Sequence, residues 1–177
     1  MAKRILVPLD GSTTAEAVLA RVGDLASGAG ATIRLLHVAP VPENLYGTDD
    51  HLIAYADQEI ARLEAEHLDY LASVEPCLPD VPVERAVRFG DPVREILREA
   101  EEWSADLIAV TRNGRSGLGR MVLGSVAEQV FRKAGLPVVL YHGGQGHVTK
   151  ESARRRGAWA RERSRARDRR KPCLPVI

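Results

Sequence analysis

Residues 107–126 read Leu-Ile-Ala-Val-Thr-Arg-Asn-Gly-Arg-Ser-Gly-Leu-Gly-Arg-Met-Val-Leu-Gly-Ser-Val, and this stretch decides the fold. Its first four residues, Leu107–Val110, form a short apolar run typical of a buried parallel strand. From Ser125 onward, apolar residues recur at helical spacing, at Val126, Val130, Phe131 and Ala134. The glycine-rich loop between them therefore follows a strand and precedes a helix, which is the arrangement of an α/β fold.

This loop has the composition of an anion-binding cradle. Unpaired backbone N–H groups and the dipole at the start of a helix favour a phosphate, and glycine lets the backbone approach it closely. Gly114, Arg115 and Gly124 supply such groups, and Ser125 is predicted to cap the helix and to donate to a phosphate oxygen. The alternative is a glycine-rich turn that binds nothing, because short motifs also occur by chance.

Two well-known phosphate loops do not match. Gly114 and Gly119 have the spacing of a Walker A loop, but Arg120-Met121 stands where Lys and Ser or Thr are needed. The dinucleotide-binding pattern G-x-G-x-x-G lacks its third glycine, because Val122 occupies that position.

The loop instead resembles the signature of the universal stress protein family, G-x2-G-x9-G-[ST]. Gly114, nine further residues and Gly124-Ser125 match it, whereas Thr111 stands in place of the first glycine. The resemblance implies that ATP is bound, with Mg²⁺ or Mn²⁺ held through its phosphates, and that Thr111 lies near the sugar and inner phosphate. A β-branched residue tolerates positive φ badly and fills space that glycine leaves open, so we expect Thr111 to weaken the site.

A second group of candidate residues follows the first strand. Arg4–Asp10 contains a continuous apolar run, and a helix that starts near Thr13, with Glu16 at capping-box spacing, leads to a second strand at Ile33–Val38. Such a strand–helix–strand unit makes the sheet parallel. Asp10 then lies at the carboxyl end of a strand, where ligands bind in open α/β sheets. The predicted buried face of the helix is Ala15, Val18, Leu19, Val22, Leu25 and Ala26.

Asp10 has two open roles. It either caps the following turn, or its carboxylate accepts a sugar hydroxyl or base amino group or holds Mg²⁺ through water. The family resemblance favours the ligand role, since members carry the same Val-Pro-Leu-Asp-Gly-Ser wording beside the nucleotide, and it places backbone groups of Val38 at the adenine. The predicted nucleotide-binding residues are Pro8, Leu9, Asp10, Val38, Val110, Thr111, Gly114, Arg115, Gly124, Ser125 and Val126.

The remaining elements complete a doubly wound sheet. Ala39–Asp50 is predicted to be a loop able to fold over a ligand, and Val83–Phe89 an edge strand, because its apolar and polar residues alternate. Asp91-Pro92 predicts a helix start and Pro137–Tyr141 the last strand. Five parallel strands in the order 3-2-1-4-5 with four helices form a Rossmann-like α/β fold. The resemblance covers residues 3–141 and implies the same adenine-nucleotide-binding fold.

Two of these helices have long predicted apolar faces. The face of the helix before the edge strand is Leu52, Ile53, Ala56, Ile60, Leu63, His67, Leu71 and Val74. The face of the helix after Asp91 is Val93, Ile96, Leu97, Ala100 and Trp103. His67 is interpreted as a packed histidine, and the five histidines as scattered, so no metal site is predicted.

Composition divides the 177 residues into two parts. Residues 1–146 hold 14 basic and 21 acidic residues, a net charge of −7, whereas residues 147–177 hold 11 and 3, a net charge of +8. We therefore expect one α/β domain over 1–146 and a basic tail over 147–177 that is disordered when free. The tail is either a solvated segment, a partner for the acidic domain, or a binder of RNA or DNA phosphates with salt-sensitive affinity.

The chain has the features of a cytoplasmic homodimer. No apolar run approaches the roughly 20 residues of a membrane span, and Cys77 and Cys173 lack a metal or redox spacing. The last strand is an apolar sheet edge, which is a pairing site unless it is covered. Family members commonly dimerise there, so the resemblance implies a homodimer through Val138–Tyr141, with the tail as the alternative cover.

The residues indicate binding rather than catalysis. No base is placed to activate water, so at most slow ATP hydrolysis is expected, and no catalytic residue is predicted. The resulting hypothesis is an ATP-binding stress-response protein that acts as a nucleotide-dependent switch or sensor. The alternative is a stress protein that binds no nucleotide and associates with nucleic acid or another partner through its basic tail.

Overall fold

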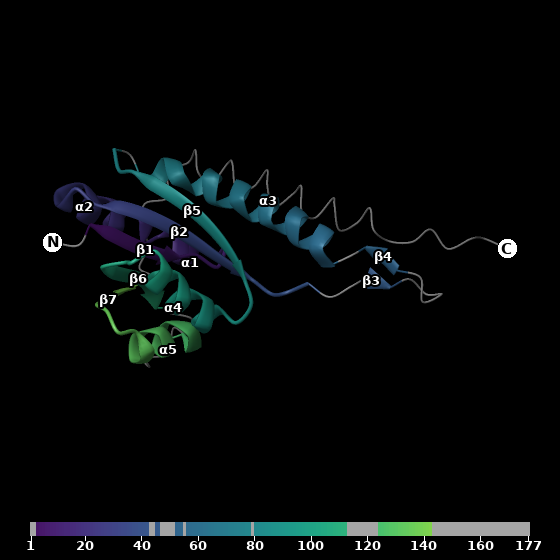
Figure 1. The fold of residues 1–177 in the computed structure, drawn as a ribbon. Helices are drawn as coiled ribbons and strands as arrows, with labels where there is room; N and C mark the ends of the chain where they lie inside the picture. Colours follow the sequence, from purple (N-terminus) through teal and green to yellow (C-terminus); the bar gives the residue numbers. More distant parts are fainter. Residues whose placement is uncertain are drawn as a thin grey trace, which may run out of the picture. The chain divides into compact units, whose positions relative to one another are not determined.

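A computed structural model describes residues 3–42, 45–46, 52–54, 56–78, 80–112 and 124–142. Its centre is a five-stranded parallel sheet in the order β5-β2-β1-β6-β7 (Figure 1). The strands are β1 (Arg4–Pro8), β2 (Thr32–Ala39), β5 (Val83–Phe89), β6 (Leu107–Arg112) and β7 (Val138–His142). In chain order these are the first to fifth sheet strands, so the predicted order 3-2-1-4-5 is confirmed.

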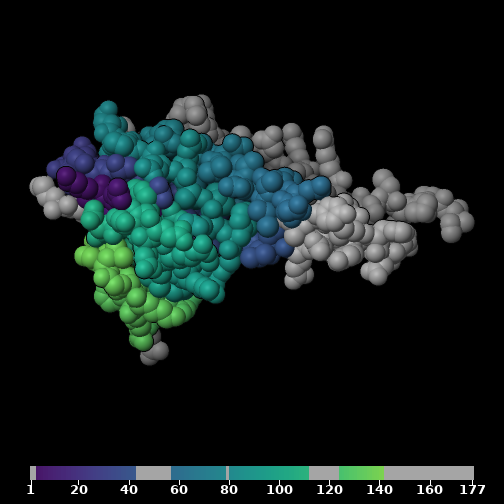
Figure 2. All heavy atoms as spheres, viewed as in Figure 1, coloured from purple at the N-terminus to yellow at the C-terminus, as the bar shows by residue number. Residues whose placement is uncertain are grey.

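Helices cover both faces of the sheet. In Figure 1, α2 (Leu19–Ala29) and α3 (Ala56–Val74) lie on one side, and α4 (Pro92–Glu102) and α5 (Ser125–Lys133) on the other. The central strand explains this arrangement, because its residues Ile5, Leu6 and Val7 are all fully buried and alternate between the two faces. The same view with all atoms drawn shows α3 in blue and α4 and α5 in teal and green at the surface (Figure 2). Described elements all belong to the unit Met1–Gly146, and the tail 147–177 lies outside the described residues.

The first helix starts differently from the prediction. Ser12, not Thr13, is the N-cap, because its Oγ accepts a hydrogen bond from the Ala15 N–H at 3.1 Å. The helix is then interrupted, so α1 (Thr13–Glu16) is separate from α2. Gly30 ends α2 in the left-handed conformation, with φ of 62°. Leu25, which was predicted to be buried, is 41% exposed.

A short hairpin replaces part of a predicted loop and helix. Residues Leu45–Tyr46 form β3 and pair antiparallel with β4, at Leu52–Ala54. The prediction of a loop over Ala39–Asp50 followed by a helix at Leu52 was therefore wrong. A short apolar run such as Leu52-Ile53 fits a strand as well as a helix, and periodicity alone does not separate them. A 3₁₀ turn, η1 (Glu75–Cys77), follows α3.

The helices near the candidate site follow the prediction in part. Asp91 caps α4 by accepting from the Arg94 N–H at 2.9 Å, with Pro92 in the first turn, as predicted. Two carboxylates, Glu95 and Glu99, unexpectedly lie on the buried face of this helix. On α5, Phe131 is 51% exposed, contrary to the prediction of a buried position. Within the described ranges, no helix is both long and apolar enough to cross a membrane.

Candidate functional site

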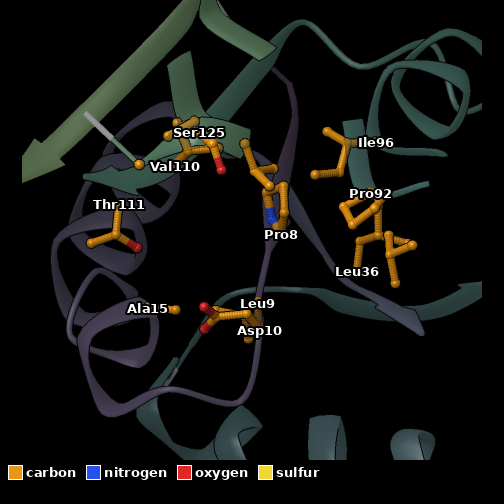
Figure 3. Close-up of a pocket in the computed structure, with 14 residues that line it drawn as sticks. Pro8, Leu9, Asp10, Ala15, Leu36, Pro92, Ile96, Val110, Thr111 and Ser125 are labelled. Atoms are coloured by element: carbon orange, nitrogen blue, oxygen red, sulfur yellow. The ribbon is translucent and has the colours of Figure 1, made fainter. Parts of the chain in front are cut away.

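A pocket lies at the carboxyl ends of the central strands. It has a volume of about 210 Å³ and is lined from β1, β2, β6 and the first turns of α4 and α5 (Figure 3). Within the sheet, β1 has β2 as its neighbour on one side and β6 on the other, so the strand order reverses at β1. Ligands of open α/β sheets bind at such a reversal of strand order, so the fold places the pocket where a ligand site is expected.

Most of the residues predicted from the sequence surround this pocket. Nine of the eleven line it: Pro8, Leu9, Asp10, Val38, Val110, Thr111, Gly124, Ser125 and Val126. The other two, Gly114 and Arg115, lie outside the described residues. The structure thus brings together residues that are more than 100 positions apart in the chain. That these residues bind a nucleotide remains a prediction.

Five further lining residues were not predicted as site residues. They are Ala15, Leu36, Pro92, Ile96 and Ala127. Ile96 was expected on the buried face of its helix and Ala15 on that of the first helix. Apolar periodicity shows that such a side chain faces the interior, but it does not distinguish a packed core from the wall of a pocket.

The pocket has an apolar and a polar side. Figure 3 shows Leu36, Pro92 and Ile96 on one side of Pro8, and Thr111 with the Asp10 carboxylate on the other. The apolar side belongs to the cluster that α4 and α5 form against the sheet. A ligand with a flat apolar part and a polar part fits this division.

Asp10 performs the predicted capping role and also lines the pocket. Its Oδ1 accepts a hydrogen bond from the Ser12 N–H at 2.9 Å, which closes the turn after β1. The turn passes through Gly11, whose φ of 77° favours glycine. A carboxylate offers about four acceptor positions, so this bond leaves acceptor capacity for a ligand hydroxyl.

The start of α5 forms the polar end of the pocket. Gly124 is the N-cap and no side chain caps the helix, so the prediction that Ser125 caps it was wrong. Ser125 is already the first helical residue and is exposed. The first intrahelical bond of the cap goes from the Glu128 N–H to the Gly124 carbonyl at 2.9 Å. The N–H groups of Ser125, Val126 and Ala127 therefore precede the helical ladder, and all three residues line the pocket.

Thr111 lies in the pocket wall without backbone strain. It belongs to β6 and pairs with Tyr141 of β7. Among the non-glycine residues that the structure describes, only Asp80 and Ser104 have positive φ. The expected conflict with positive φ was therefore wrong, because the residue adopts extended backbone, which β-branched residues favour. Its half-buried side chain still occupies space in the pocket.

A polar cluster lies behind the turn that carries Asp10. The rings of His37 and His67 are 4.2 Å apart between centroids, so the interpretation of the histidines as scattered was wrong for this pair. Tyr70 contacts His37 edge-on at 5.8 Å and donates a hydrogen bond to Glu16 at 3.3 Å. Burial raises the pKa of the Tyr70 hydroxyl above its ordinary value, and Glu16 and Asp10 raise it further. In the part of the chain that the structure describes, no three His, Cys, Asp or Glu side chains are arranged to hold a metal.

The family model described as "Universal stress protein family" matches residues 1–142. The chain belongs to the universal stress protein family. A universal stress protein of Mycobacterium tuberculosis is 35% identical over 138 residues, which are 77% of this chain and 44% of the relative. The chain therefore spans less than half the length of this family member.

Solved structures of the family have the same fold. The structure of protein MJ0577 is 26% identical and superimposes with a TM-score of 0.63, covering 81% of this chain and 97% of the other. A universal stress protein in complex with cAMP is 22% identical, with a TM-score of 0.55 and coverage of 81% and 98%. These likenesses confirm the Rossmann-like α/β fold that the glycine loop and the strand pattern predicted.

Proposed function

We propose that the pocket binds an adenine nucleotide, ATP in the first place, and that nucleotide occupancy switches the protein between states in a stress response. The observation that carries this proposal is the convergence of the motif residues of two strand ends and a helix N-terminus on one pocket. Family membership supports the proposal, and cAMP, the ligand named for a solved protein of this fold, is an adenine nucleotide.

Each side of the pocket suits one part of such a ligand. Leu36, Pro92 and Ile96 offer an apolar surface for the flat base. The Asp10 carboxylate lines the pocket, and in the proposed complex it accepts a hydrogen bond from a ribose hydroxyl. The N–H groups at the start of α5 favour phosphate oxygens, because they lack intrahelical partners and carry the positive end of the helix dipole.

The pocket favours retention of the nucleotide over its turnover. Asp10 is the single carboxylate among the pocket-lining residues that the structure describes, and one of its oxygens is held by the Ser12 N–H. A divalent ion would therefore be carried mainly by the phosphates, where it would neutralise their charge, with Asp10 reaching it at most through water. We infer that ATP hydrolysis, if it occurs, is slow.

Calorimetric titration of ATP with Mg²⁺ into the full chain tests this proposal, with ADP, AMP, cAMP and GTP as comparisons. Gly124→Val should abolish binding, because the valine side chain would project at the pocket end of α5. The backbone at Gly124, with φ of −56° and ψ of 142°, accepts a β-branched residue, so the fold should survive.

Gly135→Val is the matched control. A Cβ at Gly135 meets no atom within 4 Å, and this residue does not line the pocket. The control should bind ATP as the unmodified chain does. If the unmodified chain gives no heat and millimolar ATP leaves its melting temperature unchanged, the nucleotide proposal is wrong. The basic tail 147–177 would then be tested for nucleic acid binding by deletion.

A further inference from the structure

The turn that carries Asp10 begins at the buried Leu9, but the residues after Leu9 have little packing of their own. Asp10, Gly11 and Thr13 are exposed, and Ser12 is half-buried. The turn is closed by the bond from the Ser12 N–H to Asp10 and is followed by the bond from the Ala15 N–H to the Ser12 Oγ. Its position relative to the sheet therefore depends on contacts made by neighbouring elements.

His37 holds the first residue of this turn from β2. Its Nδ1 lies 2.8 Å from the carbonyl oxygen of Leu9. A carbonyl oxygen only accepts, so Nδ1 must carry the hydrogen and donate it. On the other side of the same residue, the Leu9 N–H donates to the Leu36 carbonyl at 2.8 Å. Leu9 lines the pocket, so His37 acts directly on a residue of the pocket wall.

Tyr70 holds the helix that follows the turn, α1, from α3. It is 4% exposed, and its hydroxyl donates to Glu16 of α1 at 3.3 Å. His37 contacts two rings of α3. The ring of Tyr70 meets it edge-on, and the ring of His67 lies against it at 4.2 Å between centroids. Beside the cluster, the charged groups are Glu16 on α1 and Asp10 on the turn itself.

We infer that His37 and Tyr70 are positioning residues of the nucleotide site. They hold the Leu9–Asp10–Gly11 turn at its two ends, His37 at Leu9 and Tyr70 through Glu16 of the following helix α1. In this way α3, of which no described residue lines the pocket, contributes to the position of the Asp10 carboxylate. This inference rests on the proposed nucleotide function. It adds to the residues that determine affinity His37, which lies on the pocket-lining strand β2, and Tyr70, which lies on α3 outside the pocket lining.

Substitutions on the full chain test the inference through the dissociation constant for ATP. Tyr70→Phe and His37→Leu should each weaken binding about three- to tenfold, which is the effect expected from one lost buried hydrogen bond. His37→Asn should restore near-normal binding, because the Asn amide nitrogen occupies the place of Nδ1 and donates. Glu16→Gln should likewise bind better than Glu16→Ala, because Gln keeps an acceptor for the Tyr70 hydroxyl.

Ser73→Ala is the matched control. It also deletes one hydroxyl from α3, but Ser73 Oγ donates to the Tyr70 carbonyl of its own helix at 2.7 Å. We expect this variant to bind ATP normally. Normal binding by both Tyr70→Phe and His37→Leu would overturn the inference.

Amide hydrogen exchange of the nucleotide-free chain separates this inference from the nucleotide proposal. In Tyr70→Phe and His37→Leu, the Gly11 and Ser12 amides should exchange about three- to tenfold faster, while the amides of Ile5–Val7 in β1 keep their protection. Equal acceleration in the turn and in β1 would mean a merely structural role and would overturn the inference. If the unmodified chain binds no nucleotide, the function proposal fails, and exchange at Gly11 and Ser12 still decides whether the two residues order the turn.

Discussion

Thr111 illustrates how a single residue departs from a family motif without breaking the fold. The family signature has a glycine at this position, and a threonine was expected to conflict with a positive φ. Because Thr111 lies in the extended backbone of β6, this conflict does not arise, and the volume of its side chain is the remaining difference from glycine in the pocket. Thr111 therefore belongs to the pocket wall as a filler of space on the polar side.

Thr111→Gly should tighten ATP binding at least about tenfold, because it removes a hydroxyl and two carbon atoms from the pocket wall, and a single methylene group in a pocket already changes affinity by about that factor. The free energy of unfolding should fall by about 0.5–1 kcal/mol, since glycine weakens a strand. Calorimetry gives the first value and urea denaturation the second. Thr111→Ser removes only the methyl group, so its affinity for ATP should lie between that of the unmodified chain and that of Thr111→Gly. Weaker binding by both variants would show instead that the threonine contributes a favourable contact to the ligand.

At the scale of the element, α4 places an acidic residue in the interior. Glu99 is 2% exposed and accepts from Arg34 at 2.7 Å and from Arg88 at 2.5 Å. The guanidinium of Arg34 also lies 4.5 Å from the ring centre of Trp103. These contacts tie α4 to β2 and β5, so the carboxylate joins three elements next to the apolar side of the pocket.

Glu99→Gln should lower the free energy of unfolding by about 1–3 kcal/mol, because it leaves two cations without their shared anion. The upper limit is below that of fully buried pairs, since the side chains of Arg34 and Arg88 are 23% and 27% exposed. The control is Glu84→Gln, whose carboxylate is 46% exposed and pairs with Arg34, and its cost should be under about 1 kcal/mol. Equal stability losses for the two variants in urea would contradict this account.

These elements also show which parts of the fold a sequence specifies. The parallel strands were predictable because a strand covered on both faces needs an uninterrupted apolar run, as in Ile5–Val7. The burial of Glu99 was not, because it depends on Arg34 and Arg88, which meet at this carboxylate only once β2, β5 and α4 have packed together. Phe131 was misplaced because periodicity reports which face of a helix is apolar, whereas exposure depends on what packs against that face.

The candidate site contains residues that the sequence predicted and residues whose role depends on tertiary packing. Asp10, Gly124 and Ser125 were predictable because their motifs carry local backbone requirements. His37 and Tyr70 were not, because their contacts with the Asp10 turn exist only once β2 and α3 have packed. Local motifs thus predicted nine of the residues that line the pocket, whereas tertiary packing brought in the other lining residues and the contacts that hold the lining in place.

At the scale of the whole molecule, β7 is one of the two edge strands of the sheet, the other being β5. Among the strands that the structure describes, β7 pairs with β6 on one side and with none on the other. The Ile108 N–H donates to the Pro137 carbonyl at 3.0 Å, which fixes the parallel register and leaves alternate backbone groups of β7 facing outward. The proposed homodimer through Val138–Tyr141 would pair these groups with the same strand of a second copy.

Val139→Lys should convert such a dimer to a monomer, because a lysine on an edge strand places a charge where two strands would meet. Light scattering coupled to size-exclusion chromatography measures the mass over a range of concentrations. Val41→Lys is the control, since Val41 is 60% exposed and lies outside β7, and it should leave the mass unchanged. Val139 is half-buried, so thermal unfolding must show that its variant remains folded. A folded Val139→Lys variant with the dimer mass would exclude pairing through β7, and a monomeric unmodified chain would exclude the dimer itself.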